Sequence, residues 1–272
     1  MTPRMNYTLD VAALSDSGKV RPHNEDSISQ RTETGVLVLA DGMGGYNAGE
    51  VASALATELV AEGLHGRCSA AGEGRPVSNA ILSRWIDEQV NAANTAILHR
   101  ARADASCAGM GATLALTVFR GRTVTVGHVG DSRVYRFRQG ELQSLTRDHS
   151  LLEEQIRNGL LSRDEARRSH NRSVVTRALG VDPEVDTEIQ VYDVRPGDIF
   201  LICSDGLTDM VDDDTIGSSL AATRHDLQLT ARNLVQLAND CGGRDNISVI
   251  LARVAGQDPW WSRLYGRLRR AA

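Results

Sequence analysis

Four aspartates in the sequence share one local pattern: each lies near glycine, at the edge of a short apolar segment. The segments and their acids are Val36–Ala40 with Asp41, Thr123–Val129 with Asp131, Ile199–Cys203 with Asp205, and Ile247–Val254 with the preceding Asp245. Apolar runs this short predict buried β-strands and are too short for core helices. The pattern therefore requires a fold in which several strands end at, or begin from, a carboxylate.

A carboxylate at the buried end of a strand is costly to remove from water unless a cation neutralises it. If several of these acids converge, they repel one another, and a hard divalent cation such as Mg²⁺ or Mn²⁺ is the usual remedy, because it prefers oxygen ligands. Glycine allows the backbone to approach an ion closely, so the carbonyl of Gly42 could take part. Asp-Gly pairs also form ordinary turns, so spacing alone leaves both interpretations open.

The other patterns predict further strands in neighbouring runs and a few longer helices. Alternation of apolar residues predicts a strand from Tyr7 to Ala13, and apolar periodicity predicts helices over residues 50–64 and 78–101. Similar patterns predict strands over residues 113–119, 133–138 and 185–192, and a helix over residues 227–238. Because strands follow strands and helices lie elsewhere, we expect an α+β fold and not a repeated βαβ unit.

Composition excludes several classes of protein. The formal net charge of −5 argues against a nucleic-acid-binding protein. The longest apolar runs have five residues, whereas a membrane-spanning helix needs about 20, and the N-terminus lacks the apolar region of a secretory signal. The four cysteines form no CxxC pair, which argues against a zinc site or a disulfide framework and favours a reducing cytoplasm. We therefore expect a cytoplasmic enzyme or regulator.

The composition changes near residue 255. Residues 257–272 contain four arginines, one aspartate and two of the three tryptophans. We expect a catalytic domain over residues 1–255 and a basic aromatic tail over residues 256–272. As a helix, the tail would place Trp261, Leu264, Tyr265 and Leu268 on one stripe, and another face would carry Arg263, Arg267 and Arg270. Such a helix suits an anionic membrane surface or an acidic groove on a partner, and packing on the catalytic domain is the alternative.

Seven short motifs occur in a fixed order between residues 7 and 254. They are RxxNED at 21–26, DGMGG at 41–45, GDSR at 130–133, TRDH at 146–149, TRALG at 176–180, SDGL at 204–207 and GxxDN at 242–246. Each motif alone is weak, but the ordered set resembles the metal-dependent serine/threonine protein phosphatases of type 2C, the PPM family, in their bacterial form.

The resemblance implies a four-layer α-β-β-α sandwich, in which helices flank a central antiparallel β-sandwich. It implies hydrolysis of phosphoserine and phosphothreonine in proteins by a metal-bridging hydroxide, reversing a serine/threonine kinase. The cofactors would be two core Mn²⁺ or Mg²⁺ ions and a third, weaker one, and the protein would be a monomer. A phosphatase of small phosphate esters and a pseudophosphatase that binds phosphoproteins without turnover are the alternatives.

The resemblance also assigns roles to individual residues. Arg21, Asp41, Asp205 and Asp245 form the catalytic set, and Arg21 clamps the substrate phosphate. The metal ligands are Asp41, the carbonyl of Gly42, Asp205 and Asp245, with Asp131 and Asp205 holding the third ion. Glu25, Asp26 and Asn246 surround these ligands.

One position departs from the pattern of many eukaryotic relatives, which have histidine after Asp-Gly. This chain has Met43, which cannot donate a proton to the leaving alkoxide. A water near Asp131 and Asp205 is the first candidate donor, and His149 is the second. The segment 148–173 resembles the variable flap beside the active site, and its arginines, Arg163, Arg167, Arg168 and Arg172, could favour acidic phosphopeptides.

Overall fold

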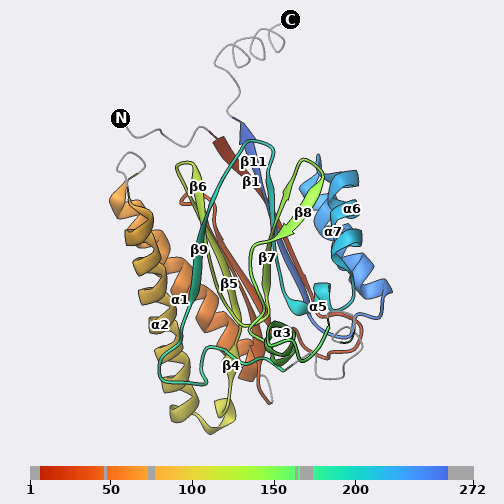
Figure 1. Ribbon diagram of the computed structural model, residues 1–272. Coiled ribbons are helices and arrows are strands. Elements are labelled where there is room, and N and C mark those ends of the chain that lie inside the picture. Colours follow the sequence, from red (N-terminus) through yellow and green to blue (C-terminus); the bar gives the residue numbers. More distant parts are fainter. Residues whose placement is uncertain (1–6, 46–47, 73–76, 163–164, 166–173, 257–272) are drawn as a thin grey trace, which may run out of the picture.

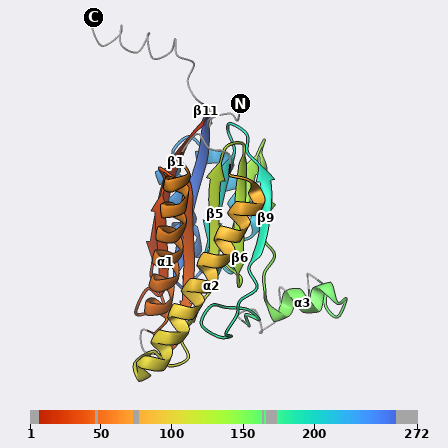
Figure 2. The ribbon, with the colours of Figure 1, turned by 90° about the vertical axis from the view of Figure 1, so that its left-hand side faces the viewer.

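The computed structural model describes residues 7–45, 48–72, 77–162, 165 and 174–256. Two antiparallel sheets pack face to face, and helices cover both outer faces, so the four-layer arrangement is confirmed (Figures 1 and 2). The first sheet has the order β1 (Tyr7–Asp16), β11 (Ile247–Gly256), β10 (Ile199–Cys203), β7 (Arg133–Arg138), β8 (Glu141–Ser144). The second has the order β2 (Asp26–Arg31), β3 (Val36–Met43), β5 (Leu114–Arg120), β6 (Thr123–Val129), β9 (Glu188–Asp193), and β4 (Gly111–Ala112) pairs with β3.

Strand β10 and the first five residues of β3 are apolar at every position because both of their faces are buried. In β3, Leu37 and Leu39 pack between the two sheets, whereas Val36 and Val38 pack beneath the helices of the second sheet. Strand β10 follows the same alternation on the other side of the sandwich. These strands therefore appear in the sequence as unbroken apolar runs.

Two long helices cover the second sheet, and a shorter pair covers the first (Figure 1). The long pair is α1 (Ala48–Ala71) and α2 (Asn79–Ala103), and the shorter pair is α6 (Asp213–Thr223) and α7 (Leu227–Asp240). The hydroxyl of Ser78 and the carboxylate of Asp226 cap α2 and α7 by accepting hydrogen bonds from backbone N–H groups in the first turn. The short elements are η1 (Ala105–Cys107), α3 (Leu151–Arg157) and α5 (Asp205–Thr208).

The strand predicted over residues 185–192 begins later, at Glu188. The N–H of Val185 donates to Oδ1 of Asn91 on α2, so this residue is bound to a helix instead of a neighbouring strand. No described helix is long and apolar enough to cross a membrane.

The antiparallel pairing fixes two ends of the sandwich. Strands β3, β6 and β10 finish at one end, where β2 and β11 begin. We call this end the acid end, because Asp26, Asp41, Asp131, Asp205 and Asp245 lie at these strand termini. The opposite end, which we call the far end, contains the start of β10, the end of β9 and Gly256.

Candidate metal centre

The acid end brings the predicted carboxylates together. Asp26 lies directly opposite Asp41 in the register of β2 and β3. Asp205 is the first residue of α5, immediately after β10 and Ser204. Burial raises the pKa of Asp41 well above its ordinary value, and the charges of Asp26, Asp205 and Asp131 raise it further. The convergence that the strand-end pattern predicted is therefore present.

Basic side chains of the described residues do little to neutralise these acids, although the charge of Arg133 acts to lower the pKa of Asp131. Within the described part of the chain, no ion pair joins Asp26, Asp41, Asp131 or Asp205 to lysine or arginine. Burial is the largest cause that raises the pKa of Asp26 and of Asp131 to about 6. The pKa of Asp205 is also raised well above its ordinary value, first by burial and then by Asp131.

Two buried carboxylate oxygens have no hydrogen-bond partner among the described residues: Oδ1 of Asp26 and Oδ1 of Asp205. A buried acceptor without a partner is costly, and two such acceptors in one carboxylate cluster suit a shared cation. Since the side-chain atoms that could ligate a metal here are all carboxylate oxygens, the site fits a hard divalent ion such as Mg²⁺ or Mn²⁺.

Backbone and hydroxyl groups hold the carboxylates in place. The hydroxyl of Ser204 donates to Oδ2 of Asp26 at 2.8 Å. The N–H of Asp41 donates to Oγ1 of Thr113 at 3.1 Å, and that oxygen also lies 2.7 Å from Oγ of Ser132. Sequence analysis missed these three supporting hydroxyls, although Ser132 and Ser204 lie within the GDSR and SDGL motifs.

Gly42 is required by packing. A side chain at this position would collide with the carbonyl groups of Gly49, in the first turn of α1, and of Glu25. The backbone of β3 can therefore approach α1 closely only because residue 42 lacks a Cβ.

Arg21 lies at the edge of the cluster. Its Nη2 donates to Oδ2 of Asp245 at 2.7 Å, and about half of its side chain is exposed. Asn246 holds the preceding loop: its Oδ1 accepts from the N–H of Glu25 at 2.7 Å, and its Nδ2 donates to the carbonyls of Ser17 and His23. Glu25 itself has a raised pKa, chiefly because of burial. The structure thus brings Arg21, Glu25 and Asn246 to the acids, as predicted.

The ring of His149 is bound to Gly130 and Glu188. Its Nδ1 accepts from the N–H of Gly130 at 3.2 Å, and its Nε2 lies 3.4 Å from Oε2 of Glu188. Burial lowers the pKa of His149, and the neighbouring His128 lowers it further. Both ring nitrogens are engaged with Gly130 and Glu188, and the lowered pKa makes the ring neutral near pH 7, so a role of His149 as donor stays a prediction.

A cleft of about 500 Å³ extends from the acids toward α3 and α6. Most of its lining is acidic or apolar, including Asp131, Asp205, Asp209, Leu152 and Met210, and Arg133 is the one basic residue among the described residues that line it. The predicted arginines of the flap, at 163, 167, 168 and 172, lie outside the described residues. The surface that the structure describes beside the site is therefore acidic and apolar.

Comparison with known proteins places the chain among phosphatases. The profile of the Protein phosphatase 2C family matches residues 19–241. The serine/threonine protein phosphatase PstP of Mycobacterium tuberculosis is 36% identical over 255 residues, which cover 94% of this chain and 47% of that protein. The serine/threonine phosphatase stp of Listeria welshimeri is 32% identical over 240 residues, covering 87% of this chain and 92% of that protein.

A solved structure of similar fold is described as the catalytic domain of PstP in complex with two manganese ions. It superposes with a TM-score of 0.77 at 35% identity, covering 92% of this chain and 99% of that one. The chain spans about half the length of PstP.

Proposed function

The chain belongs to the protein phosphatase 2C family, and on this premise we propose that it is a metal-dependent phosphatase that hydrolyses phosphoserine and phosphothreonine in proteins. The observation that carries the proposal is the cluster of Asp26, Asp41, Asp131 and Asp205, which lacks basic partners and leaves two buried oxygens unbonded. Such a cluster is costly in the empty protein and is complete only with bound cations.

The two core ions would be held by Asp41, the carbonyl of Gly42, Asp205 and Asp245, and a third by Asp131 and Asp205. Mn²⁺ or Mg²⁺ bound there would acidify water and neutralise charge on the phosphoryl oxygens. The PstP structure with two manganese ions supports this choice of cofactor. Asp26 and Glu25 lie beside the ligands, where they can accept hydrogen bonds from water.

Arg21 is the residue suited to bind the substrate phosphate. Its guanidinium is half exposed, stands beside the acids, and has donors beyond the one that Asp245 accepts. A planar guanidinium can bind two phosphate oxygens at once. It would therefore orient the phosphoryl group over the carboxylate cluster and neutralise part of its charge.

No thiol nucleophile is implied. Cys203 is buried beside the site, and burial raises its pKa to about 12, so its sulfur is protonated and unreactive near pH 7. Since Met43 has no proton to give and His149 faces Glu188, Asp131 and Asp205 remain as the groups that hold a proton-donating water.

Two other functions are less well supported. A pseudophosphatase would be expected to lack metal ligands, whereas Asp41, Asp205 and Asp245 are all present. A phosphatase of small esters would use the same centre, but the cleft beside Asp131 and Asp205 is large enough for the side chains that flank a phosphorylated residue.

The setting of the enzyme is part of the proposal. It would act in signal transduction in the cytoplasm of a bacterium, as a monomer, opposing a serine/threonine kinase. Residues 1–255 would be the catalytic domain and residues 256–272 a docking tail. Because β11 ends at the far end, a tail that starts there would bind an anionic membrane surface or an acidic partner without covering the acids.

The test is phosphate release from phosphothreonine and phosphoserine peptides with and without divalent metal. EDTA should abolish release, and added Mn²⁺ should restore it. Full activity in metal-free buffer would refute the metal-dependent mechanism, and activity on aryl phosphates alone would favour the small-ester function.

A further inference from the structure

His128, His149 and Glu188 form a cluster on the edge of the second sheet, outside the carboxylate cluster. One ligand atom from each lies within 4.8 Å of the others, and the two imidazole rings stack with centroids 4.6 Å apart. His128 and Glu188 are directly opposed in the register of β6 and β9, so both side chains point to the same face. Two histidines and a carboxylate are a familiar zinc-binding set.

The hydrogen bonds of the cluster argue against a metal. A carbonyl only accepts, so Nε2 of His128, 2.8 Å from the carbonyl of Arg147, carries a proton. Gly130 donates its N–H to Nδ1 of His149, so the single proton of that neutral ring is on Nε2. A metal on Nε2 of His149 would move this proton to Nδ1, where it would face the N–H of Gly130.

The same hydrogen bonds connect the cluster to Asp131. His149 binds both backbone polar groups of Gly130: its N–H donates to the carbonyl at 2.9 Å, and its ring nitrogen accepts at 3.2 Å. Gly130 has a φ of +100°, and a Cβ there would lie 2.8 Å from the side chain of Thr113. The turn before Asp131 is thus a special conformation that neighbouring groups must hold.

We propose that His149 is a positioning residue: Glu188 holds its Nε2–H, and its Nδ1 lone pair fixes the N–H of Gly130 and so the carboxylate of Asp131. The lowered pKa of Glu188 agrees with this. Burial would raise that pKa, but Gln190, His128 and His149 together lower it, so Glu188 is an ionised acceptor.

The hydrogen bonds of His149 also connect the start of the flap segment, residues 148–173, with the chain that follows it. The carbonyl of His149 accepts from the N–H of Thr176 at 2.7 Å, and Ser150, the next residue, caps α3. Two consecutive residues, His149 and Ser150, therefore connect the turn before Asp131 with the start of α3. The proposal rests on the proposed function only for the role of Asp131 as a metal ligand.

A matched pair of variants separates positioning from packing. In His149→Phe the ring still stacks on His128 but no acceptor remains, whereas in His149→Asn the amide oxygen can replace Nδ1 although the stacking ring is lost. We expect His149→Phe to weaken the weakest Mn²⁺ site about tenfold, as loss of a group that orients a ligand does. His149→Asn should retain most of that affinity. The reverse order would show that His149 acts by packing and would overturn the proposal.

Two measurements make the test independent of turnover. Calorimetric titration with Mn²⁺ gives site affinities, and exchange of the Gly130 amide proton reports the hydrogen bond directly. This proton should exchange about tenfold faster in His149→Phe than in wild type. An unchanged exchange rate of the Gly130 amide proton would overturn the proposed positioning by His149, whether or not the protein is a phosphatase.

A double-variant cycle tests the link to Asp131. If His149 acts through Asp131, His149→Phe should cause no further loss of Mn²⁺ affinity in an Asp131→Ala background. Additive losses would overturn the link. If Asp131→Ala alone leaves the Mn²⁺ titration unchanged, Asp131 is not a metal ligand. The exchange rate of the Gly130 amide proton then still tests the hydrogen bond from Gly130 to His149.

Discussion

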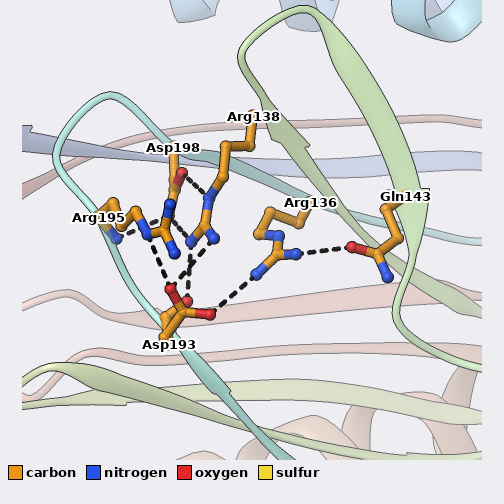
Figure 3. Close-up of polar contacts among 6 residues, drawn as sticks. All are labelled: Arg136, Arg138, Gln143, Asp193, Arg195 and Asp198. Carbon is orange, nitrogen blue, oxygen red and sulfur yellow. Dashed lines mark hydrogen bonds and ion pairs between the residues drawn. The ribbon is translucent and has the colours of Figure 1, made fainter.

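The aspartates at the two ends of the sandwich have opposite electrostatic surroundings. At the far end, Arg138 binds Asp198 through two hydrogen bonds of 2.7 Å, and Asp193 accepts from Arg136, Arg138 and Arg195 (Figure 3). At the acid end, Asp26, Asp41, Asp131 and Asp205 face one another with no such partner among the described residues.

The pKa values move accordingly. Burial would raise the pKa of Asp193, but Arg138 and Arg195 bring it below the ordinary value. At the acid end, Asp26, Asp41, Asp131 and Asp205 all have raised pKa values. At the far end, arginines of the chain pair with both aspartates, whereas Asp26, Asp41, Asp131 and Asp205 have no such partner among the described residues. We therefore expect stability to depend on the ion pairs at the far end and activity to depend on the carboxylates at the acid end. Substitutions at the two ends should separate these effects.

The largest effect is expected at the acid end. Asp205→Asn keeps the size of the side chain but removes a charge that would hold two of the ions, so turnover should fall about a thousandfold or more. Asp41→Asn and Asp245→Asn should behave similarly. The unfolding temperature of the metal-free protein should not fall, because Oδ1 of Asp205 has no partner to lose. Turnover within tenfold of wild type would refute the assignment.

The matched substitution at the far end should do the opposite. Asp198→Ala leaves Arg138 without its main partner, and Asp198 is only 1% exposed. Breaking one partner of a buried pair typically costs about 3 kcal/mol. We expect denaturant unfolding to show this loss, with turnover per folded molecule unchanged. A loss of activity without a loss of stability would break the comparison.

Substitution of Arg21 should have an effect of intermediate size, because Arg21 is a cation at the acid end and pairs with Asp245. Removing a charge-assisted hydrogen bond to phosphate costs about 1.5 kcal/mol, so Arg21→Ala should raise KM about tenfold and leave Mn²⁺ affinity unchanged. Arg21→Lys should be intermediate, because lysine cannot bind two oxygens in parallel. If Arg21→Ala instead lowers Mn²⁺ affinity, Arg21 organises Asp245 and does not clamp the phosphate.

The two ends should also respond oppositely to pH in metal-free protein. The folded pKa of Asp26, about 6, is above the unfolded value of about 3.9. The stability associated with this group is thus present below pH 4 and is lost as the pH rises through 6. Asp26→Asn should therefore stabilise the protein at pH 7 and not at pH 4, and saturating Mn²⁺ should remove the gain.

Asp193→Asn is the control for that measurement. Its folded pKa is lowered, so its contribution is present above the unfolded pKa and is lost as the pH falls through the folded value. This variant should be less stable than wild type at pH 7, and the difference should disappear as the pH falls below the folded pKa of Asp193. The same pH trend in both variants would contradict the contrast between the ends.

The smallest effect on the catalytic domain is expected from the tail. Strand β11 spans ten residues, about 33 Å, between the acid end and Gly256. Deleting residues 257–272 should therefore leave turnover and the unfolding temperature unchanged while reducing binding to anionic liposomes or to an acidic partner, most clearly at low salt. A lower unfolding temperature with unchanged binding would mean that the tail packs on the domain.

Local patterns predicted the strands that are buried on both faces. Strands β7 and β10 have the predicted bounds, because a continuous or alternating apolar run marks such a strand directly. Strand β2, with the sequence DSISQR, was missed, since it is an edge strand with mostly polar side chains. Helix α6 was missed because Gly217, Ser218 and Ser219 interrupt its short apolar pattern.

The sequence by itself determined which residues are the candidate metal ligands: the ordered motifs point to Asp41, Asp131, Asp205 and Asp245, and their positions at strand ends predict that they lie near one another. Only the tertiary structure decided which charged side chains form ion pairs with one another. Arg138 and Asp198 are 60 residues apart, and Arg21 and Asp245 are 224 apart. The tautomer of His149 depends on Gly130 and Glu188, which are 19 and 39 residues away. The physical reason is that burial periodicity is a property of neighbouring residues, whereas partners distant in sequence are set by strand register and by the packing of the two sheets.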